Sequence, residues 1–113
     1  HNYRIHFTCS ATQLDELGRV IDFGVIKELL CMWLEEHWDH KMMIYDEDPL
    51  LPSLRGLVPE DLVVVPFNPT AEAMAQYLVE TVAPAQLAGT GVTLVSCRVE
   101  ETARCSATYS LPI

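Results

Sequence analysis

The sequence predicts an α+β domain, in which two helices cover one face of an antiparallel sheet. Three patterns carry this prediction. The first nine residues alternate between apolar and polar side chains, two stretches in the middle have apolar residues at helical spacing, and two alternating stretches follow near the end. With 113 residues, half of them apolar and a fifth charged, the chain is expected to form a single domain, 1–113.

Residues 1–9 are predicted to form a half-buried strand. One face of this strand consists of His1, Tyr3, Ile5, Phe7 and Cys9. His1 and His6 point to opposite faces, so they cannot bind one metal ion from a flat strand. An edge strand usually has a hairpin partner, and we therefore expect another strand before His1.

Two amphipathic helices are expected next. Asp22 can accept a backbone N–H bond as the N-cap of a helix over residues 22–38. Its apolar stripe consists of Ile26, Leu29, Leu30, Trp33 and His37. The second helix is expected to start with Asn68 as its cap and Pro69 at its first position, and to end at Pro84 and Gly89.

The remaining segments are connections and strands. Residues 46–66 hold four prolines and are expected to be mostly connection, with a short strand over Leu62–Val65. Two strands, 92–101 and 104–111, should follow, joined by a turn at residues 102–103. In the first, alternation places four residues on one face: Val95, Cys97, Val99 and Glu101.

Composition excludes several classes. Seven Lys and Arg against sixteen Asp and Glu give a net charge of −9, which argues against a nucleic-acid partner. No apolar run approaches the roughly 20 residues of a membrane helix, and no leader resembles a signal peptide, so a cytoplasmic protein without a membrane partner is expected. The four cysteines form no CxxC pair and are expected to be buried free thiols.

A few polar residues stand out as candidates for chemistry. Asp39 and His40 follow the first helix, where a carboxylate can orient an imidazole for proton transfer, or where both can simply be solvated at a helix end. Glu101 lies in phase with an apolar face, so it is paired, at an edge, or receives donors from a ligand, whereas Glu100 is expected to be solvated. Thr70 and Glu72 suit either a helix start or a binding site. His6 and His37 have no evident partner.

The chain resembles the 6-pyruvoyl-tetrahydropterin synthase and 6-carboxytetrahydropterin synthase family, which has the tunnelling fold. Five segments carry the resemblance in the family's order and spacing: His1-Asn2-Tyr3, Val20-Ile21-Asp22-Phe23, Trp38-Asp39-His40, Asn68-Pro69-Thr70-Ala71-Glu72 and Val99-Glu100-Glu101-Thr102. The fold implied is strand-strand-helix-helix-strand-strand, and its first strand would lie before His1.

The resemblance implies a role for each candidate. His1 would be one of three histidines that bind Zn²⁺, and Asp39 and His40 would activate a catalytic cysteine that lies upstream in the family. Glu101 would anchor the pterin ring, with Thr70 and Glu72 beside the pterin. None of the cysteines of this chain occupies the place of the family's nucleophile.

The activity implied is that of a carbon–oxygen lyase acting on 7,8-dihydroneopterin triphosphate. Triphosphate would be eliminated, and the product would be 6-carboxytetrahydropterin for deazapurine (queuosine) synthesis, or 6-pyruvoyl-tetrahydropterin for tetrahydrobiopterin synthesis. Hexamers with sites between subunits are typical of the family. Two alternatives remain: a non-catalytic pterin- or purine-binding homologue, and an acidic α+β interaction domain. Arg4 and Lys41 are candidates for contacts to the triphosphate.

Overall fold

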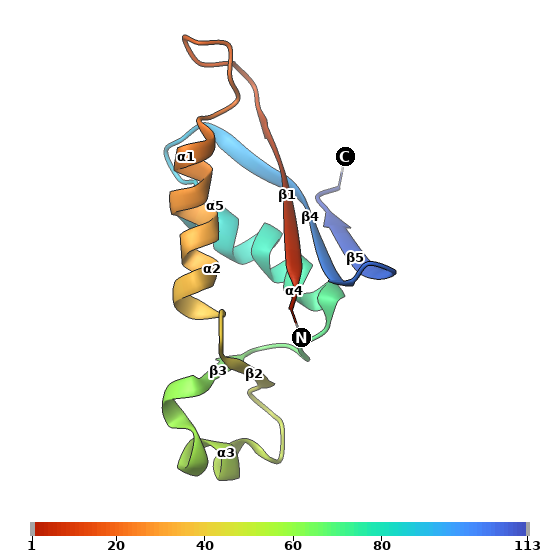
Figure 1. Cartoon of the computed structure of the whole chain (residues 1–113). Helices are drawn as coiled ribbons and strands as arrows, with labels where there is room; N and C mark the ends of the chain where they lie inside the picture. Colours follow the sequence, from red (N-terminus) through yellow and green to blue (C-terminus); the bar gives the residue numbers. More distant parts are fainter. Residues whose placement is uncertain (1, 113) are drawn as a thin grey trace.

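A three-stranded antiparallel sheet forms the centre of the protein. In the computed structural model, which describes residues 2–112, its strands lie in the order β1-β4-β5. They are β1 (Arg4–Ala11), β4 (Val92–Thr102) and β5 (Cys105–Ser110). Helices pack against one face of this sheet (Figure 1). The predicted α+β class is therefore confirmed, while the expected strand before His1 stays a prediction.

The first long helix is a continuous run of three segments, α1 (Phe23–Ile26), a π-helical stretch η1 (Lys27–Cys31) and α2 (Met32–His37). Its start is the predicted one, because the Oδ1 atom of Asp22 accepts a hydrogen bond from the Gly24 N–H at 2.7 Å. A π-helical turn leaves carbonyl groups displaced from the regular ladder. The Leu29 carbonyl in this stretch accepts a hydrogen bond from Gln86 Nε2 at 2.8 Å, which ties the two long helices together.

The second long helix is built from α4 (Ala71–Tyr77), the π-helical η3 (Leu78–Val82) and α5 (Ala83–Gln86). Its N-cap is Thr70, whose hydroxyl accepts from the Ala73 N–H at 3.1 Å, so the prediction of Asn68 as cap and Pro69 as first residue is wrong. The prediction that Pro84 ends the helix is also wrong. Pro84 lies in the first turn of α5, directly after the wide π-helical turn, where a missing N–H costs least.

A small second sheet lies in the segment expected to be connection and directly before it. Here β2 (Met42–Tyr45) pairs in parallel with β3 (Leu62–Val65), and between them lie α3 (Leu51–Leu57) and the 3₁₀ turn η2 (Pro59–Asp61). The strand at 62–65 is confirmed. The sequence interpretation missed α3 because prolines 52 and 59 open helical turns instead of interrupting them, and it assigned no strand at β2.

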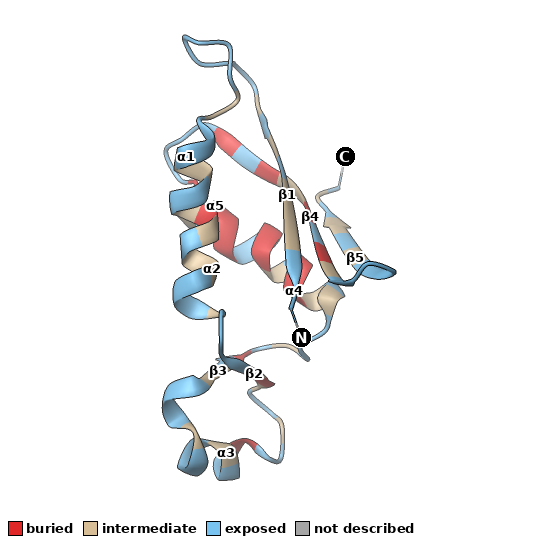
Figure 2. Ribbon diagram, viewed as in Figure 1, coloured by how far each residue is buried: buried red, intermediate tan, exposed pale blue. Residues whose placement is uncertain are grey.

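The core lies between the sheet and the two long helices (Figure 2). Cys97 and Val99 of β4 have exposed fractions of 0% and pack with the buried residues Leu30, Met74, Ala75, Leu78, Val79, Val82, Ala83, Leu87, Val92 and Leu94. The register of β1 against β4 shifts between Thr8 and Cys9, which marks a β-bulge. Because the bulge interrupts the alternation of β4, Leu94 and Cys97 on its two sides are both buried. Val95, expected on the same face as Cys97, is only half-buried there.

Within the described part of the chain, no helix is both long enough and apolar enough to cross a membrane.

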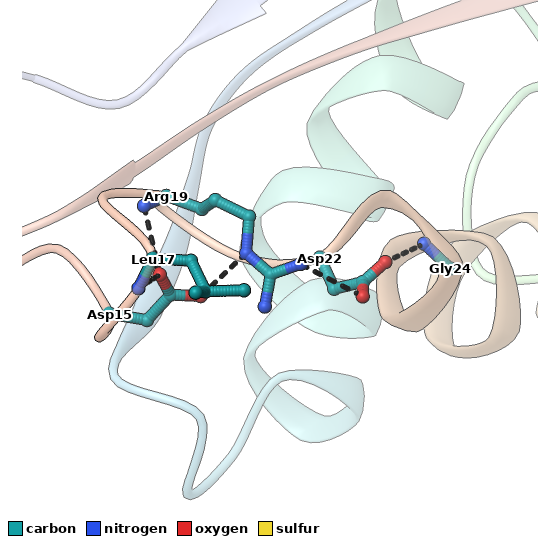
Figure 3. A network of polar contacts seen from close by, with 5 residues as sticks. All are labelled: Asp15, Leu17, Arg19, Asp22 and Gly24. Atoms are coloured by element: carbon teal, nitrogen blue, oxygen red, sulfur yellow. Dashed lines mark hydrogen bonds and ion pairs between the residues drawn. The ribbon is translucent and has the colours of Figure 1, made fainter.

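The loop before α1 is ordered by a network of polar contacts (Figure 3). The Asp15 carboxylate accepts hydrogen bonds from the backbone N–H groups of Leu17 and Arg19, both at 2.9 Å. The Arg19 guanidinium then bridges Asp15 at 2.9 Å and Asp22 at 3.1 Å. The cap of the first helix is thereby connected to the turn that precedes it.

Two substitutions at Asp22 separate the cap from the ion pair. Asp22→Ala removes both and should lower the free energy of unfolding by about 1 kcal/mol. Asp22→Asn retains a side-chain oxygen for the Gly24 N–H and should retain most of the stability, because an exposed ion pair contributes little. Urea denaturation of both variants measures the difference, and equal losses would show that the charge, not the cap, matters.

Candidate functional site

The pairing of β1 with β4 brings Tyr3 beside Glu101. Arg4 lies opposite Glu100, so the residue before β1 lies beside the end of β4. At this end the register of β4 against β5 shifts between Glu100 and Thr102. The Tyr3 hydroxyl donates a hydrogen bond to Glu101 Oε1 at 3.3 Å. Burial raises the pKa of Tyr3, and the negative charge of Glu101 and their hydrogen bond raise it further. Glu101 thus presents an exposed carboxylate at the open end of the sheet.

The neighbouring carboxylate, Glu100, is held by an ion pair. His6 Nε2 lies 3.0 Å from Glu100 Oε2, and the Glu100 side chain is only 18% exposed. The hydrogen bond with His6 lowers the pKa of Glu100, and the positive charges of Arg4 and Arg98 lower it further. The expectations of a solvated Glu100 and a partnerless His6 are therefore wrong, because partners on adjacent strands cannot be known before the register is known.

Asp39 and His40 form a pair directly after α2. His40 Nε2 lies 3.5 Å from Asp39 Oδ2, and the two side chains are 93% and 55% exposed, respectively. His40 has a φ of 58°, which is uncommon for a residue other than glycine. The preceding Trp38 stacks on Tyr77 of α4 with a centroid distance of 6.2 Å, which anchors the pair to the second helix. A solvated carboxylate–imidazole pair of this kind can hold and pass a proton.

The other candidates start the second helix. The Thr70 hydroxyl is occupied as the N-cap, and Glu72 lies exposed in the first turn of α4, where a carboxylate suits the helix dipole. In Figure 1 the start of α4, the end of α2 and the start of β1 all lie toward the lower end of the sheet. His1 lies outside the described residues. His37, expected to lack a partner, bonds through Nδ1 to the Trp33 carbonyl oxygen at 2.9 Å and stacks on the Trp33 ring.

The described residues do not by themselves form a metal centre. Between residues 2 and 112, no three His, Cys, Asp or Glu side chains are grouped so that they could hold a metal ion. The four cysteines are free. Burial raises the pKa of Cys9, and raises that of Cys97 to about 12, so both thiols stay protonated. Cys105 is exposed, contrary to the expectation that all four are buried.

Two hollows lie away from these residues. One, of about 550 Å³, is bounded by η3, α5 and the start of β4, and the other, of about 420 Å³, lies against α2 beside Trp33, His37 and Gln86. Neither is lined by Glu101 or by the Asp39–His40 pair.

Comparison with known families agrees with the resemblance found in the sequence. The family model described as 6-pyruvoyl tetrahydropterin synthase matches residues 1–112. The chain belongs to this family. The family match spans all the candidate residues, those of the Tyr3–Glu101 and Asp39–His40 pairs included.

The names of relatives agree with this assignment, and a solved structure shares the fold. A protein of Rickettsia conorii named 6-carboxy-5,6,7,8-tetrahydropterin synthase is 29% identical over 106 residues, which cover 93% of this chain and 77% of the relative. A Halobacterium salinarum protein named a probable 6-carboxy-5,6,7,8-tetrahydropterin synthase is 35% identical over 79 residues, 69% of this chain and 49% of its own. The crystal structure of an uncharacterized protein from Wolinella succinogenes has the same fold, with a TM-score of 0.81 at 23% identity over 96% of this chain and 76% of its own.

The lowered pKa of Glu100 predicts a contribution to acid stability. A carboxyl whose pKa is lower in the folded chain stabilises the fold above its unfolded pKa, about 4.3, and loses that contribution as the pH falls through its folded pKa. Urea midpoints between pH 7 and pH 3 should therefore fall less steeply for Glu100→Gln than for the unmodified chain. Glu60→Gln, at an exposed position in η2, is the matched control. Parallel curves for Glu100→Gln and the unmodified chain would contradict the prediction.

Proposed function

We propose that the protein is a zinc-dependent tetrahydropterin synthase, a carbon–oxygen lyase that eliminates triphosphate from 7,8-dihydroneopterin triphosphate. The product proposed is 6-carboxytetrahydropterin, in keeping with the names of the relatives, with 6-pyruvoyl-tetrahydropterin as the alternative product within the family. The observation that carries the proposal is the exposed Glu101 carboxylate at the end of β4, held by the Tyr3 hydroxyl.

Glu101 is suited to anchor a pterin ring. The 2-amino group and the N3–H of a pterin are two parallel donors, and a carboxylate can accept both at once. The hydrogen bond from Tyr3 restricts the carboxylate, so less conformational freedom is lost when the ring binds. A Glu at this position gives the ring a fixed orientation relative to the end of the sheet.

The Asp39–His40 pair is the proposed proton-transfer group. The Asp39 carboxylate lies 3.5 Å from the His40 imidazole and can limit the orientation of the ring, and the left-handed backbone of His40 turns the chain away from α2. Thr70 and Glu72 at the start of α4 are proposed to lie beside the bound pterin. Of these, Glu72 has the exposed side chain, whereas the Thr70 hydroxyl serves the helix cap.

Zinc dependence is proposed on the family resemblance, with His1 as a ligand. A zinc ion would act as a Lewis acid toward the oxygens of the substrate side chain. Residues 2–112 hold no group of three ligands that could bind the ion by themselves.

A homo-oligomer, a hexamer in keeping with the family, is also proposed, with sites between subunits. Its support is the open position of Glu101, since a second copy placed over the end of the sheet would cover the pterin and exclude water. A cytoplasmic location agrees with the four free thiols.

Turnover is the direct test of the proposed function. The protein is incubated with zinc and 7,8-dihydroneopterin triphosphate, and released triphosphate, acetaldehyde and pterin products are measured. We expect triphosphate and acetaldehyde in equal amounts, as the carboxy-forming reaction requires. A pyruvoyl product without acetaldehyde would assign the other branch. Pterin binding without turnover by the metal-loaded protein would favour the alternative, a non-catalytic pterin- or purine-binding homologue.

Two substitutions by glutamine should separate binding from chemistry. Glu101→Gln replaces one acceptor by a donor facing the pterin 2-amino group, and should weaken pterin binding by about 100-fold. His40→Gln should leave pterin affinity within about twofold and lower kcat by about 100-fold, because it removes only the proton-transfer group. Fluorescence titration with neopterin gives the affinities. Unchanged affinity in Glu101→Gln would exclude the anchor role.

A further inference from the structure

The face of the large sheet that points away from the helices is lined by polar side chains. Inward positions of β1 and β4, such as Ile5, Phe7, Cys97 and Val99, belong to the core. In the paired rows, the alternate positions on the other face are Arg4, His6 and Thr8 of β1, Ser96, Arg98 and Glu100 of β4, and Ser106, Thr108 and Ser110 of β5. At each of these positions the residue is charged, imidazole or hydroxyl, and all of them except the Glu100 carboxylate can donate hydrogen bonds.

The strand register concentrates positive charge on this face. Arg4 lies opposite Glu100 and His6 lies opposite Arg98, which makes the two arginines diagonal neighbours, with Cα atoms about 7–8 Å apart. The positive charges of both arginines lower the pKa of Glu100. The carboxylate is already engaged by His6 at 3.0 Å. Two guanidinium groups and the His6 imidazole therefore share this face with one carboxylate, in a chain whose net charge is −9.

We propose that this face binds an inorganic oligophosphate anion, with Arg4 and Arg98 as its principal ligands. Guanidinium groups match phosphate oxygens in a planar, bidentate geometry, and two of them on a diagonal can contact successive phosphates of one chain. Hydroxyl groups on neighbouring strands supply further donors. The Ser110 hydroxyl bonds to Ser96 Oγ at 3.1 Å, which shows that side chains of β5 and β4 meet on this face.

This site would be separate from the proposed pterin anchor. Tyr3 is in phase with Ile5 and Phe7, on the opposite face from Arg4, and it is Tyr3 that bonds to Glu101. The sheet itself therefore lies between Glu101 and the two arginines. Oligophosphate binding on the polar face should not require a pterin.

The test is calorimetric titration of the full chain with inorganic triphosphate at low salt. Arg98→Gln and Arg4→Gln should each weaken binding by about tenfold, because each removes one charge-assisted contact. Glu100→Gln should strengthen binding by several fold, because it removes the negative charge from the face. Arg55→Gln, an equal loss of charge at an exposed position on α3, is the matched control and should change affinity by less than twofold.

Weaker triphosphate binding by Arg98→Gln and stronger binding by Glu100→Gln, with unchanged binding by Arg55→Gln, would support the site. Circular dichroism shows whether each variant is folded, and Arg4, exposed at the start of β1, provides a second variant if Arg98→Gln is unstable. Equal weakening by Arg55→Gln, or no weakening by either arginine variant on the face, would overturn the proposal. Loss of triphosphate binding in saturating neopterin would overturn the separation from the pterin site. None of these binding measurements depends on turnover, so a failure of the oligophosphate site can be distinguished from a failure of the proposed enzyme activity.

Discussion

The antiparallel pairing of β1 with β4 is the constraint on which the rest of the structure depends. β4 is the central strand, and its inner face supplies two fully buried residues of the core, Cys97 and Val99. The same register sets the polar contacts at the end of the sheet, Tyr3 with Glu101 and His6 with Glu100. A slip of one residue would exchange the two faces of β1 and remove the core and both contacts together.

Besides the core that they share with the sheet, the two long helices are linked to each other by two specific contacts. Each long helix contains a π-helical turn, and in the first of them the Leu29 carbonyl accepts a hydrogen bond from Gln86 on the second helix. At the other end, Trp38 packs on Tyr77. These two contacts orient the end of the first helix, and with it the Asp39–His40 pair, relative to the start of the second.

Two carboxylates adjacent in sequence have different environments because they point to different faces of one strand. Glu100 is drawn into an ion pair among positive charges on the polar face, whereas Glu101 meets a tyrosine hydroxyl at the open end. The first is suited to set the charge of a surface, and the second to receive donors from a ligand. The division between the polar face and the proposed pterin-binding end therefore follows from the alternation of β4.

The sequence by itself determined the α+β class, the Asp22 cap, the strand at 62–65, the two final strands and the family, because these depend on local periodicity, capping chemistry and motif spacing. Only the tertiary structure decided what His6, Glu100 and Tyr3 contact, because cross-strand partners depend on register. Packing also decided that the second helix continues past Pro84 and which of Asn68 and Thr70 caps it. Both residues can cap in isolation, and the extended backbone at Thr70 selects one of them.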